Sequence, residues 1–264
     1  MTWAETMTIT ESGDGRYSAH VDDRWTSLQG VHGGVVAALA VEASSTELAS
    51  EGVDPASALR AATFGYARGN VVGDLDIDIE VVRRGRAMTT THAVVSQDGR
   101  TTTAARMHYS TPWEGQVYSD VDAPAPRPDG AIPLEFPEPA HLNRVETLLH
   151  PDTPPFGGTG RSEWIAWCRP VGENSFDPTW LTMFGDYFPP AVFTRTTEPV
   201  RAVTVEYSIQ IHDGARSWTL GDDEYLAARM HAFHSHDGFA VEDGWIHLPD
   251  GTLLATTRQT RLAG

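Results

Sequence analysis

Lysine is absent from this chain of 264 residues, so all 19 basic residues are arginines. The absence excludes a Schiff-base lysine, a Ser-Lys dyad and the lysine-containing phosphate loop of nucleoside triphosphatases. An anionic ligand must therefore be bound by arginine side chains or by backbone amides. Basic charge is also scarce, because 36 acidic residues leave a formal net charge of −17. This charge argues against nucleic acid or an anionic membrane as a partner.

Cysteine and long apolar runs are scarce as well. Cys168 stands alone, which excludes an intrachain disulfide and a thiolate metal cluster. No apolar run is long enough to span a bilayer, and residues 1–6 have neither the basic start nor the apolar core of a signal peptide. We therefore expect a soluble, cytoplasmic protein.

The pattern of elements predicts an enclosed helix followed by antiparallel strands, and this order occurs twice. In the first half, small apolar residues from Leu28 to about Gly52 predict the helix, and alternation predicts the strands. These strands are expected at residues 63–68, 76–84, 87–97 and 101–109, with Asp98-Gly99 as a hairpin turn. In the second half, strands are expected at 161–169, 202–212, 225–234, 244–247 and 253–261.

The region between the two halves differs in kind. Residues 112–170 hold eleven of the seventeen prolines and show little periodicity, apart from a short amphipathic piece at 142–149. We therefore expect three parts in the chain: an N-terminal unit at 1–111, a Pro-rich linker at 112–159 and a C-terminal unit at 160–264.

The two halves also match as sequences. Arg60-Ala-Ala-Thr-Phe-Gly-Tyr66 corresponds to Arg201-Ala-Val-Thr-Val-Glu-Tyr207 at an offset of 141. An offset of 152 relates the Asp98-Gly99 hairpin to Asp250-Gly251, and Gly33-Gly34 to Gly185-Asp186. These matches predict two copies of one helix-plus-sheet unit.

The second helix, within residues 177–193, carries one acid among apolar and aromatic residues. Its Asp-Pro start is typical of a helix N-terminus, whereas Pro189 and Pro190 require the helix to kink or end. Asp186 lies between these signals. Burying a carboxylate is costly unless it is hydrogen-bonded or used in chemistry, so Asp186 either satisfies a neighbouring backbone group or is a functional acid.

The two copies differ at equivalent positions, which carry Gly34, Thr63 and Met107 in the first copy and Asp186, Thr204 and Gln259 in the second. An acid, a hydroxyl and an amide together can accept a proton from water and fix its orientation. Taken by itself, Thr204 is explained by the preference of threonine for strands, and Gln259 is explained as a solvated polar residue on a terminal strand. The combination predicts a water-activating site.

Over most of its length the sequence resembles the acyl-CoA thioesterase II family. The resemblance rests on Gly30-Val-His-Gly-Gly-Val-Val, the Asp98-Gly99 hairpin, Phe184-Gly-Asp-Tyr-Phe-Pro-Pro-Ala-Val, the strand beginning at Ala202, and Asp250-Gly-Thr-Leu-Leu-Ala-Thr-Thr-Arg-Gln. It implies an α+β double hotdog, in which two tandem units each wrap a helix in an antiparallel sheet. It also implies hydrolysis of an acyl-CoA in fatty acid metabolism, with Asp186, Thr204 and Gln259 ordering the attacking water and without cofactor or metal.

The chain departs from the family pattern in two places. The family often has His-Ser-x-Phe-Leu-x-Pro-Gly where this chain reads Phe64-Gly-Tyr-Ala-Arg-Gly-Asn, and an Asp-His pair where it reads Glu206-Tyr207. These differences bear on specificity for the acyl group and for CoA. By analogy with other hotdog proteins, which commonly associate through their sheets, we expect a homodimer.

Thioester hydrolysis also needs donors for the developing oxyanion. The N-terminus of the first helix supplies free N–H groups, and Gly33 or Gly34 lets a ligand approach the backbone closely. The alternative role for these glycines is close packing. The CoA phosphates would be bound by arginines, for which the candidates are Arg68, Arg83, Arg84 and Arg86.

Two other functions are compatible with a hotdog fold, and a cluster of histidines raises the question of a metal. A hotdog enoyl-CoA hydratase usually has a His a few residues after the Asp, where this chain has Tyr-Phe-Pro-Pro. A non-catalytic protein that binds acyl-CoA or lipid is the alternative from another class. His231, His234, His236 and Asp237 could form a metal site, but no carboxylate-helix motif accompanies them, so no metal is expected.

Overall fold

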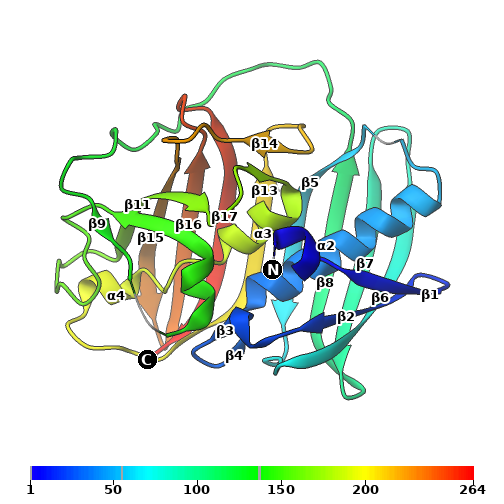
Figure 1. The fold of residues 1–264 in the computed structure, drawn as a ribbon, viewed down its shortest axis with the longest axis horizontal. Coiled ribbons are helices and arrows are strands. Elements are labelled where there is room, and N and C mark those ends of the chain that lie inside the picture. Colours follow the sequence, from blue (N-terminus) through cyan, green and yellow to red (C-terminus); the bar gives the residue numbers. More distant parts are fainter. Residues whose placement is uncertain (1, 55, 136–137) are drawn as a thin grey trace.

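One antiparallel sheet of 13 strands runs through the computed structural model, which describes residues 2–54, 56–135 and 138–264 (Figure 1). The first half contributes β1 (Ile9–Gly13), β2 (Arg16–Val21), β5 (Ala58–Tyr66), β6 (Gly73–Arg84), β7 (Thr89–Gln97) and β8 (Arg100–Ser110). The second half contributes β9 (Ile132–Pro133), β10 (Val145–Leu149), β11 (Glu163–Pro170), β13 (Ala202–Ile211), β15 (Leu226–His236), β16 (Phe239–His247) and β17 (Leu253–Ala263).

Short elements complete the fold. Two small ladders pair β3 (Thr26–Ser27) with β4 (Gly30–Val31) and β12 (Ser175–Phe176) with β14 (Trp218–Thr219). The helices are α1 (Trp3–Thr6), α2 (Gly33–Ser50), α3 (Pro178–Gly185) and α4 (Val192–Arg195), with 3₁₀ turns η1 (Asp23–Trp25) and η2 (Ala140–Arg144).

Strand order shows that the two halves are copies of one unit. From the centre outward the first half reads β5-β8-β7-β6-β2 and the second reads β13-β17-β16-β15-β11. β5 and β13 pair at the centre, where Phe64 lies opposite Tyr207 and their rings stack with centroids 5.7 Å apart. The predicted duplication is therefore confirmed, and a continuous ladder joins the copies into one sheet.

Side-chain alternation explains why the strands form where they do. In β6, Leu75, Ile77 and Ile79 are buried, whereas the intervening aspartates at 74, 76 and 78 are exposed. This period of two places one face of the strand against the core and the other in solvent.

α2 and α3 lie on the same face of the sheet and pack against each other (Figure 1). α2 is apolar nearly all round and its residues 34–41 are almost completely buried. A Cβ added to Gly34 would lie 2.6 Å from the Met183 carbonyl oxygen, so glycine at this position allows the two helices to approach closely.

The first helix begins later than the sequence predicts. Helix was expected from Leu28, but residues 26–31 form the β3–β4 ladder and α2 begins at Gly33. The reason lies in Gly30, whose φ of 113° is incompatible with a right-handed helix and which packs against the backbone of Asn70.

Part of the predicted linker belongs to the sheet. Within the amphipathic piece at 142–149, β10 pairs with β11 on one side and with β9 on the other. Two residues of the predicted linker lie outside the described residues, at 136 and 137. The sheet therefore extends beyond the second copy and ends at β9.

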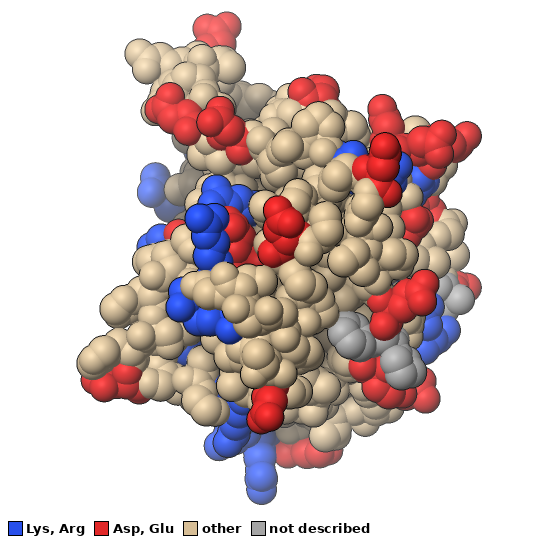
Figure 2. Space-filling model, turned by 90° about the vertical axis from the view of Figure 1, so that its left-hand side faces the viewer, with Lys and Arg blue, Asp and Glu red and all other residues tan. Residues whose placement is uncertain are grey.

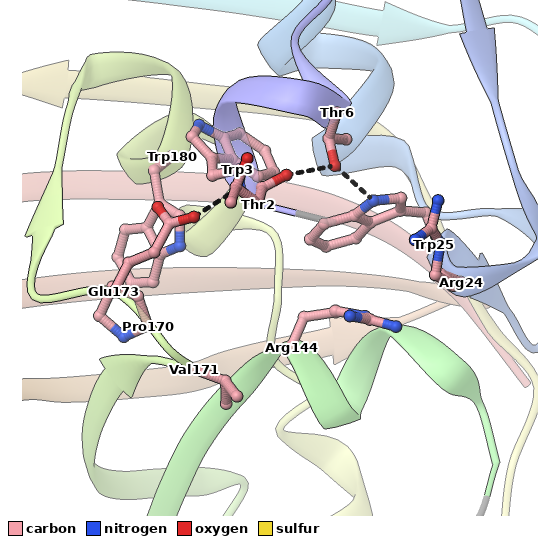
Figure 3. A pocket seen from close by; sticks show the side chains of 10 residues that line it. All are labelled: Thr2, Trp3, Thr6, Arg24, Trp25, Arg144, Pro170, Val171, Glu173 and Trp180. Atoms are coloured by element: carbon pink, nitrogen blue, oxygen red, sulfur yellow. Dashed lines mark hydrogen bonds between the residues drawn. The ribbon is translucent and has the colours of Figure 1, made fainter.

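The N-terminal segment is anchored on the second copy. Trp3 donates from its indole Nε1 to Thr179 Oγ1 at 2.8 Å and from its backbone N to Glu173 Oε1 at 2.9 Å. Figure 3 shows Trp3, Trp25 and Glu173 among the residues that line a small cavity here. The volume of this cavity is about 40 Å³. This volume holds little more than one water, so the contact is structural.

Charge is distributed unevenly over the surface. Figure 2 shows a side of the molecule on which acidic side chains are spread widely and arginines form smaller groups. In the described parts of the chain we find no helical segment with the length and apolar character that a bilayer span requires.

Candidate active site

Asp186 is the residue at which α3 ends. Asp177 caps the start of this helix by accepting a hydrogen bond from the Trp180 backbone N–H at 2.9 Å, and Pro178 follows at the first helical position. The helix stops at Gly185, before the prolines at 189 and 190. Asp186 is only 7% exposed, so its carboxyl group is held inside the protein.

The Asp186 carboxyl group faces the N-terminus of α2. A Cβ added to Gly33 would lie 3.0 Å from Asp186 Oδ2 and 3.0 Å from Tyr66 Cζ. Glycine at 33 therefore leaves a gap between the carboxyl group, which comes from the second copy, and the tyrosine ring, which comes from the first. The Tyr66 hydroxyl is buried and, among the described residues, has no hydrogen-bond partner.

Burial raises the pKa of Asp186 to about 7. The negative charge of Glu242 acts in the same direction, whereas the Arg261 guanidinium and hydrogen bonds from the Gly34 backbone and the Thr204 hydroxyl lower the pKa. A carboxyl group with a pKa near neutrality can both accept and return a proton at physiological pH.

Thr204 and Gln259 lie next to this carboxyl group and bind each other. Thr204 Oγ1 donates to Gln259 Oε1 at 2.8 Å, and Gln259 Nε2 donates to the Gly185 carbonyl oxygen at 3.3 Å. The second bond fixes the amide orientation, because only the nitrogen can donate to a carbonyl. The structure thus brings Asp186, Thr204 and Gln259 together from α3, β13 and β17.

A cavity of about 630 Å³ opens onto this group between the two copies. Of the five residues that the sequence singled out, Gly33, Asp186 and Thr204 line it. Gln259 lies behind Thr204, and Gly34 packs against the Met183 carbonyl. A large part of the remaining wall is aromatic or proline and comprises Tyr66, Pro139, Pro155, Phe156, Trp164, Tyr187, Phe188, Pro189, Pro190, Phe193 and Pro199.

Two arginines line the same cavity with exposed side chains, Arg68 after β5 and Arg201 before β13. Arg68 was among the four candidates for phosphate binding. The other three, Arg83, Arg84 and Arg86, lie at or beyond the distant end of β6, where Arg84 forms an ion pair with Glu51 at 3.2 Å.

The sequence reasoning missed an ion pair at the site. Arg261 Nη1 donates to Thr204 Oγ1 at 2.9 Å, and its Nη2 donates to Glu242 Oε1 at 2.9 Å. Arg261 follows Gln259 by two residues on one strand, so their shared face could have indicated it. Glu242 lies opposite Gln259 on the neighbouring strand, and only strand register reveals this.

Two histidines were also missed. The His32 and His141 rings stack with centroids 4.4 Å apart and line the cavity. Burial holds the pKa of His32 well below its usual value and lowers that of His141 to about 4, so both imidazoles are neutral at pH 7. His32 Nε2 lies 3.1 Å from the Asp186 carbonyl oxygen and, being neutral, holds this residue in place without adding charge.

Comparison with known proteins agrees with this architecture. Residues 21–110 match the acyl-CoA thioesterase N-terminal domain, and residues 119–263 match the acyl-CoA thioesterase C-terminal domain. No curated protein matches the chain.

Solved structures share the whole fold at low sequence identity. A conserved protein of unknown function with hot dog fold from Alicyclobacillus acidocaldarius is 20% identical, with a TM-score of 0.86 over 100% of this chain and 99% of that chain. Acyl-CoA thioesterase II TesB2 from Mycobacterium marinum is 18% identical, with a TM-score of 0.75 over 98% and 97% of the two chains. The tesB protein of Mycobacterium avium subs paratuberculosis is 17% identical, with a TM-score of 0.75 over 99% and 98%. The predicted double hotdog fold is confirmed.

Proposed function

Because the chain belongs to the acyl-CoA thioesterase family, we propose that it hydrolyses an acyl-CoA to a free acid and CoA, with Asp186 as the general base. One observation carries the proposal. The Asp186 carboxyl group, whose pKa burial raises to about 7, faces the N-terminus of α2 across the gap at Gly33, and this gap opens into the cavity.

In the proposed reaction, ionised Asp186 accepts a proton from a water molecule while the water oxygen attacks the thioester carbonyl carbon. Thr204 lines the cavity beside Asp186 and orients this water. Gln259 acts as a positioning residue, because it contacts Thr204 and the end of α3 from behind. When the tetrahedral intermediate collapses, the C–S bond breaks and protonated Asp186 returns its proton to the CoA thiolate.

The negative charge that develops on the carbonyl oxygen needs donors. At the start of α2 the Val35 N–H already bonds to the His32 carbonyl, and the Gly34 N–H is directed to Asp186. We therefore assign the oxyanion to the Gly33 N–H, which is at the positive end of the helix dipole. Tyr66 supplies a second donor, because burial keeps its pKa well above the usual value and its hydroxyl protonated.

The two ends of the substrate fit different parts of the cavity. The aromatic and proline wall suits the apolar acyl group, since burying apolar surface contributes about 25 cal/mol per Å². The exposed Arg68 and Arg201 can bind the CoA phosphates through charge-assisted hydrogen bonds.

The test is hydrolysis of a panel of acyl-CoAs, with release of CoA followed by a thiol reagent at pH 5 to 9. Wild-type kcat/KM should rise with pH through about 7, because Asp186 acts in its ionised form. Asp186→Asn should lose at least about a thousandfold in kcat, since Asn cannot accept the proton. Thiol release by this variant at the wild-type rate would refute the assignment, and loss of enoyl absorbance without thiol release would identify a hydratase.

The stability of Asp186→Asn serves as the folding control. The folded-state pKa of about 7 lies above the usual 3.8, so the stability that Asp186 contributes is complete below pH 3.8 and is lost as pH rises through about 7. Asn carries no charge and avoids this loss. The variant should therefore melt at the wild-type temperature or above it at pH 8, and a lower melting temperature would mean that inactivity reflects misfolding.

A further inference from the structure

We propose that Arg261 and Glu242 are a buried pair of positioning residues, which hold the Thr204 hydroxyl and the turn after Asp186 in their reactive arrangement. The inference rests on the proposed function, because it explains how the groups around the water are held. It is carried by the hydrogen bonds and burial of the pair itself.

Arg261 and Glu242 form a buried ion pair. The side chains of Arg261 and Glu242 are 7% and 2% exposed, and Arg261 Nη2 lies 2.9 Å from Glu242 Oε1. Replacing a buried ion pair by apolar side chains of similar size is often neutral or even stabilising, because the desolvation of the two charges offsets their attraction. The same two strands carry a second pair, Arg258 with Asp243 at 2.6 Å, whose side chains are 60% and 20% exposed. Only the buried pair reaches the site.

Arg261 fixes the direction of the Thr204 hydroxyl. Its Nη1 donates to Thr204 Oγ1 at 2.9 Å and so occupies a lone pair of that oxygen. Because the hydroxyl has a single proton, it donates either to Gln259 Oε1, which lies at 2.8 Å, or to the Asp186 carboxyl group. Without the guanidinium the hydroxyl could rotate, and the orientation of the water would no longer be fixed.

The pair also holds the turn after Asp186 at both ends. Arg261 Nη2 donates to the Phe188 carbonyl oxygen at 3.4 Å, and Glu242 Oε2 accepts from the Ala191 backbone N–H at 2.6 Å. Between them stand Pro189 and Pro190, which have no N–H to donate. Phe188 and both prolines line the cavity, so the pair connects the cavity wall to β16 and β17.

The two charges act on Asp186 in opposite directions: the Arg261 charge lowers its pKa and the Glu242 charge raises it. The titratable and charged groups that face Asp186 from the surrounding elements are Arg261 of β17, Glu242 of β16, Tyr66 of β5, Tyr207 of β13 and His32 before α2. Burial keeps the two tyrosines protonated and His32 neutral. Among these groups, Arg261 and Glu242 are therefore the two that carry a charge at neutral pH.

The experiment compares Arg261→Met with Glu242→Gln in the pH profile of kcat/KM. Arg261→Met should move the acidic limb to higher pH, and Glu242→Gln should move it to lower pH. Both should lower kcat by about tenfold to a hundredfold, because the hydroxyl and the turn are no longer held. Shifts in the same direction, or no shifts, would overturn the proposal.

Matched controls separate position from general destabilisation. Arg258→Met and Asp243→Asn, which break the exposed pair on the same strands, should leave the pH profile unchanged. The double variant Arg261→Met/Glu242→Gln removes both buried charges and covers the case in which a single variant fails to fold. Its acidic limb should lie between those of the single variants while its kcat stays low; a wild-type kcat would refute the positioning role.

A measurement without substrate distinguishes this proposal from the proposed function. In protein labelled with ¹³C at aspartate carboxyl carbons, the Asp186 signal is assigned by its loss in Asp186→Asn and titrated by NMR. The two single variants should move this titration in opposite directions. If they do and acyl-CoA is not hydrolysed, the role proposed for Arg261 and Glu242 stands and the proposed thioesterase activity is refuted. If acyl-CoA is hydrolysed but these shifts are absent, only the role proposed for Arg261 and Glu242 is refuted.

Discussion

Asp186 shows how one residue acquires its chemistry from its surroundings. Its sequence neighbours indicate burial, and burial is the main cause of its raised pKa. The groups that moderate this pKa are the Arg261 charge from β17 and hydrogen bonds from β13 and the start of α2, all far away in the sequence. The residue could be singled out from the chain, whereas its proton affinity could not.

The two adjacent glycines of α2 should respond differently to alanine. The Gly33 methyl would enter the gap between Asp186 Oδ2 and Tyr66 Cζ, both side-chain atoms that can shift slightly. Gly33→Ala should therefore fold with near wild-type stability but lose about a hundredfold in kcat/KM, because the thioester carbonyl is displaced. Activity assays and thermal melting measure the two effects.

Gly34→Ala is the matched comparison, since its methyl would meet the Met183 backbone carbonyl at 2.6 Å. Forcing α2 away from α3 should cost about 1 to 3 kcal/mol in free energy of unfolding. Equal losses of stability in Gly33→Ala and Gly34→Ala would contradict the distinction between a clearance for substrate and a packing contact.

At the scale of elements, α3 is a short helix that depends on its ends. With eight residues it is too short to be stable alone, so the cap at Asp177 and its burial against α2 hold it. Its C-terminal end sets the position of Asp186. The sequence contains a signal for each end, the Asp-Pro start and the two prolines at 189 and 190, because capping and proline chemistry are local.

Removing the N-cap should therefore destabilise the protein. Asp177 accepts hydrogen bonds from the Trp180 N–H and from Thr179 Oγ1, so Asp177→Ala should cost about 1 kcal/mol in free energy of unfolding. Chemical denaturation measures the change. Asp177→Asn, which keeps a capping oxygen, is the control and should restore most of the loss; an equal loss in both variants would mean that capping is not the cause.

The elements that the sequence misplaced share a physical cause. Gly30 turns the chain before α2 because its backbone packs against Asn70, and β10 forms because β11 offers it an edge. Both depend on partners distant in the sequence. Alternation and caps act within a few residues, so they predicted the main strands and the start of α3 correctly.

At the scale of the whole molecule, the two copies share a sheet, a helix contact and a site. β5 pairs with β13, α2 packs on α3, and the cavity takes residues from both copies. The halves should therefore unfold together in one transition, with equal calorimetric and van't Hoff enthalpies.

Phe64→Ala tests this coupling, because Phe64 is completely buried and stacks on Tyr207 across the junction of the copies. The variant should lower the free energy of unfolding by about 3 to 5 kcal/mol while the protein still unfolds in a single transition, whereas Phe64→Leu should lower it less. If differential scanning calorimetry resolves two transitions in the wild type, the two copies do not unfold together as expected.

The sequence alone determined the duplication, the main strands, the buried acid on the second helix and the type of residue that accompanies it, because these follow from local periodicity and from comparison of the copies. Only the tertiary structure decided that Gly33 clears the space in front of Asp186 while Gly34 packs, and that Arg261, paired with Glu242, donates a hydrogen bond to Thr204. The physical reason is that these contacts cross between strands and between copies, and their register is set by the packing of the whole sheet.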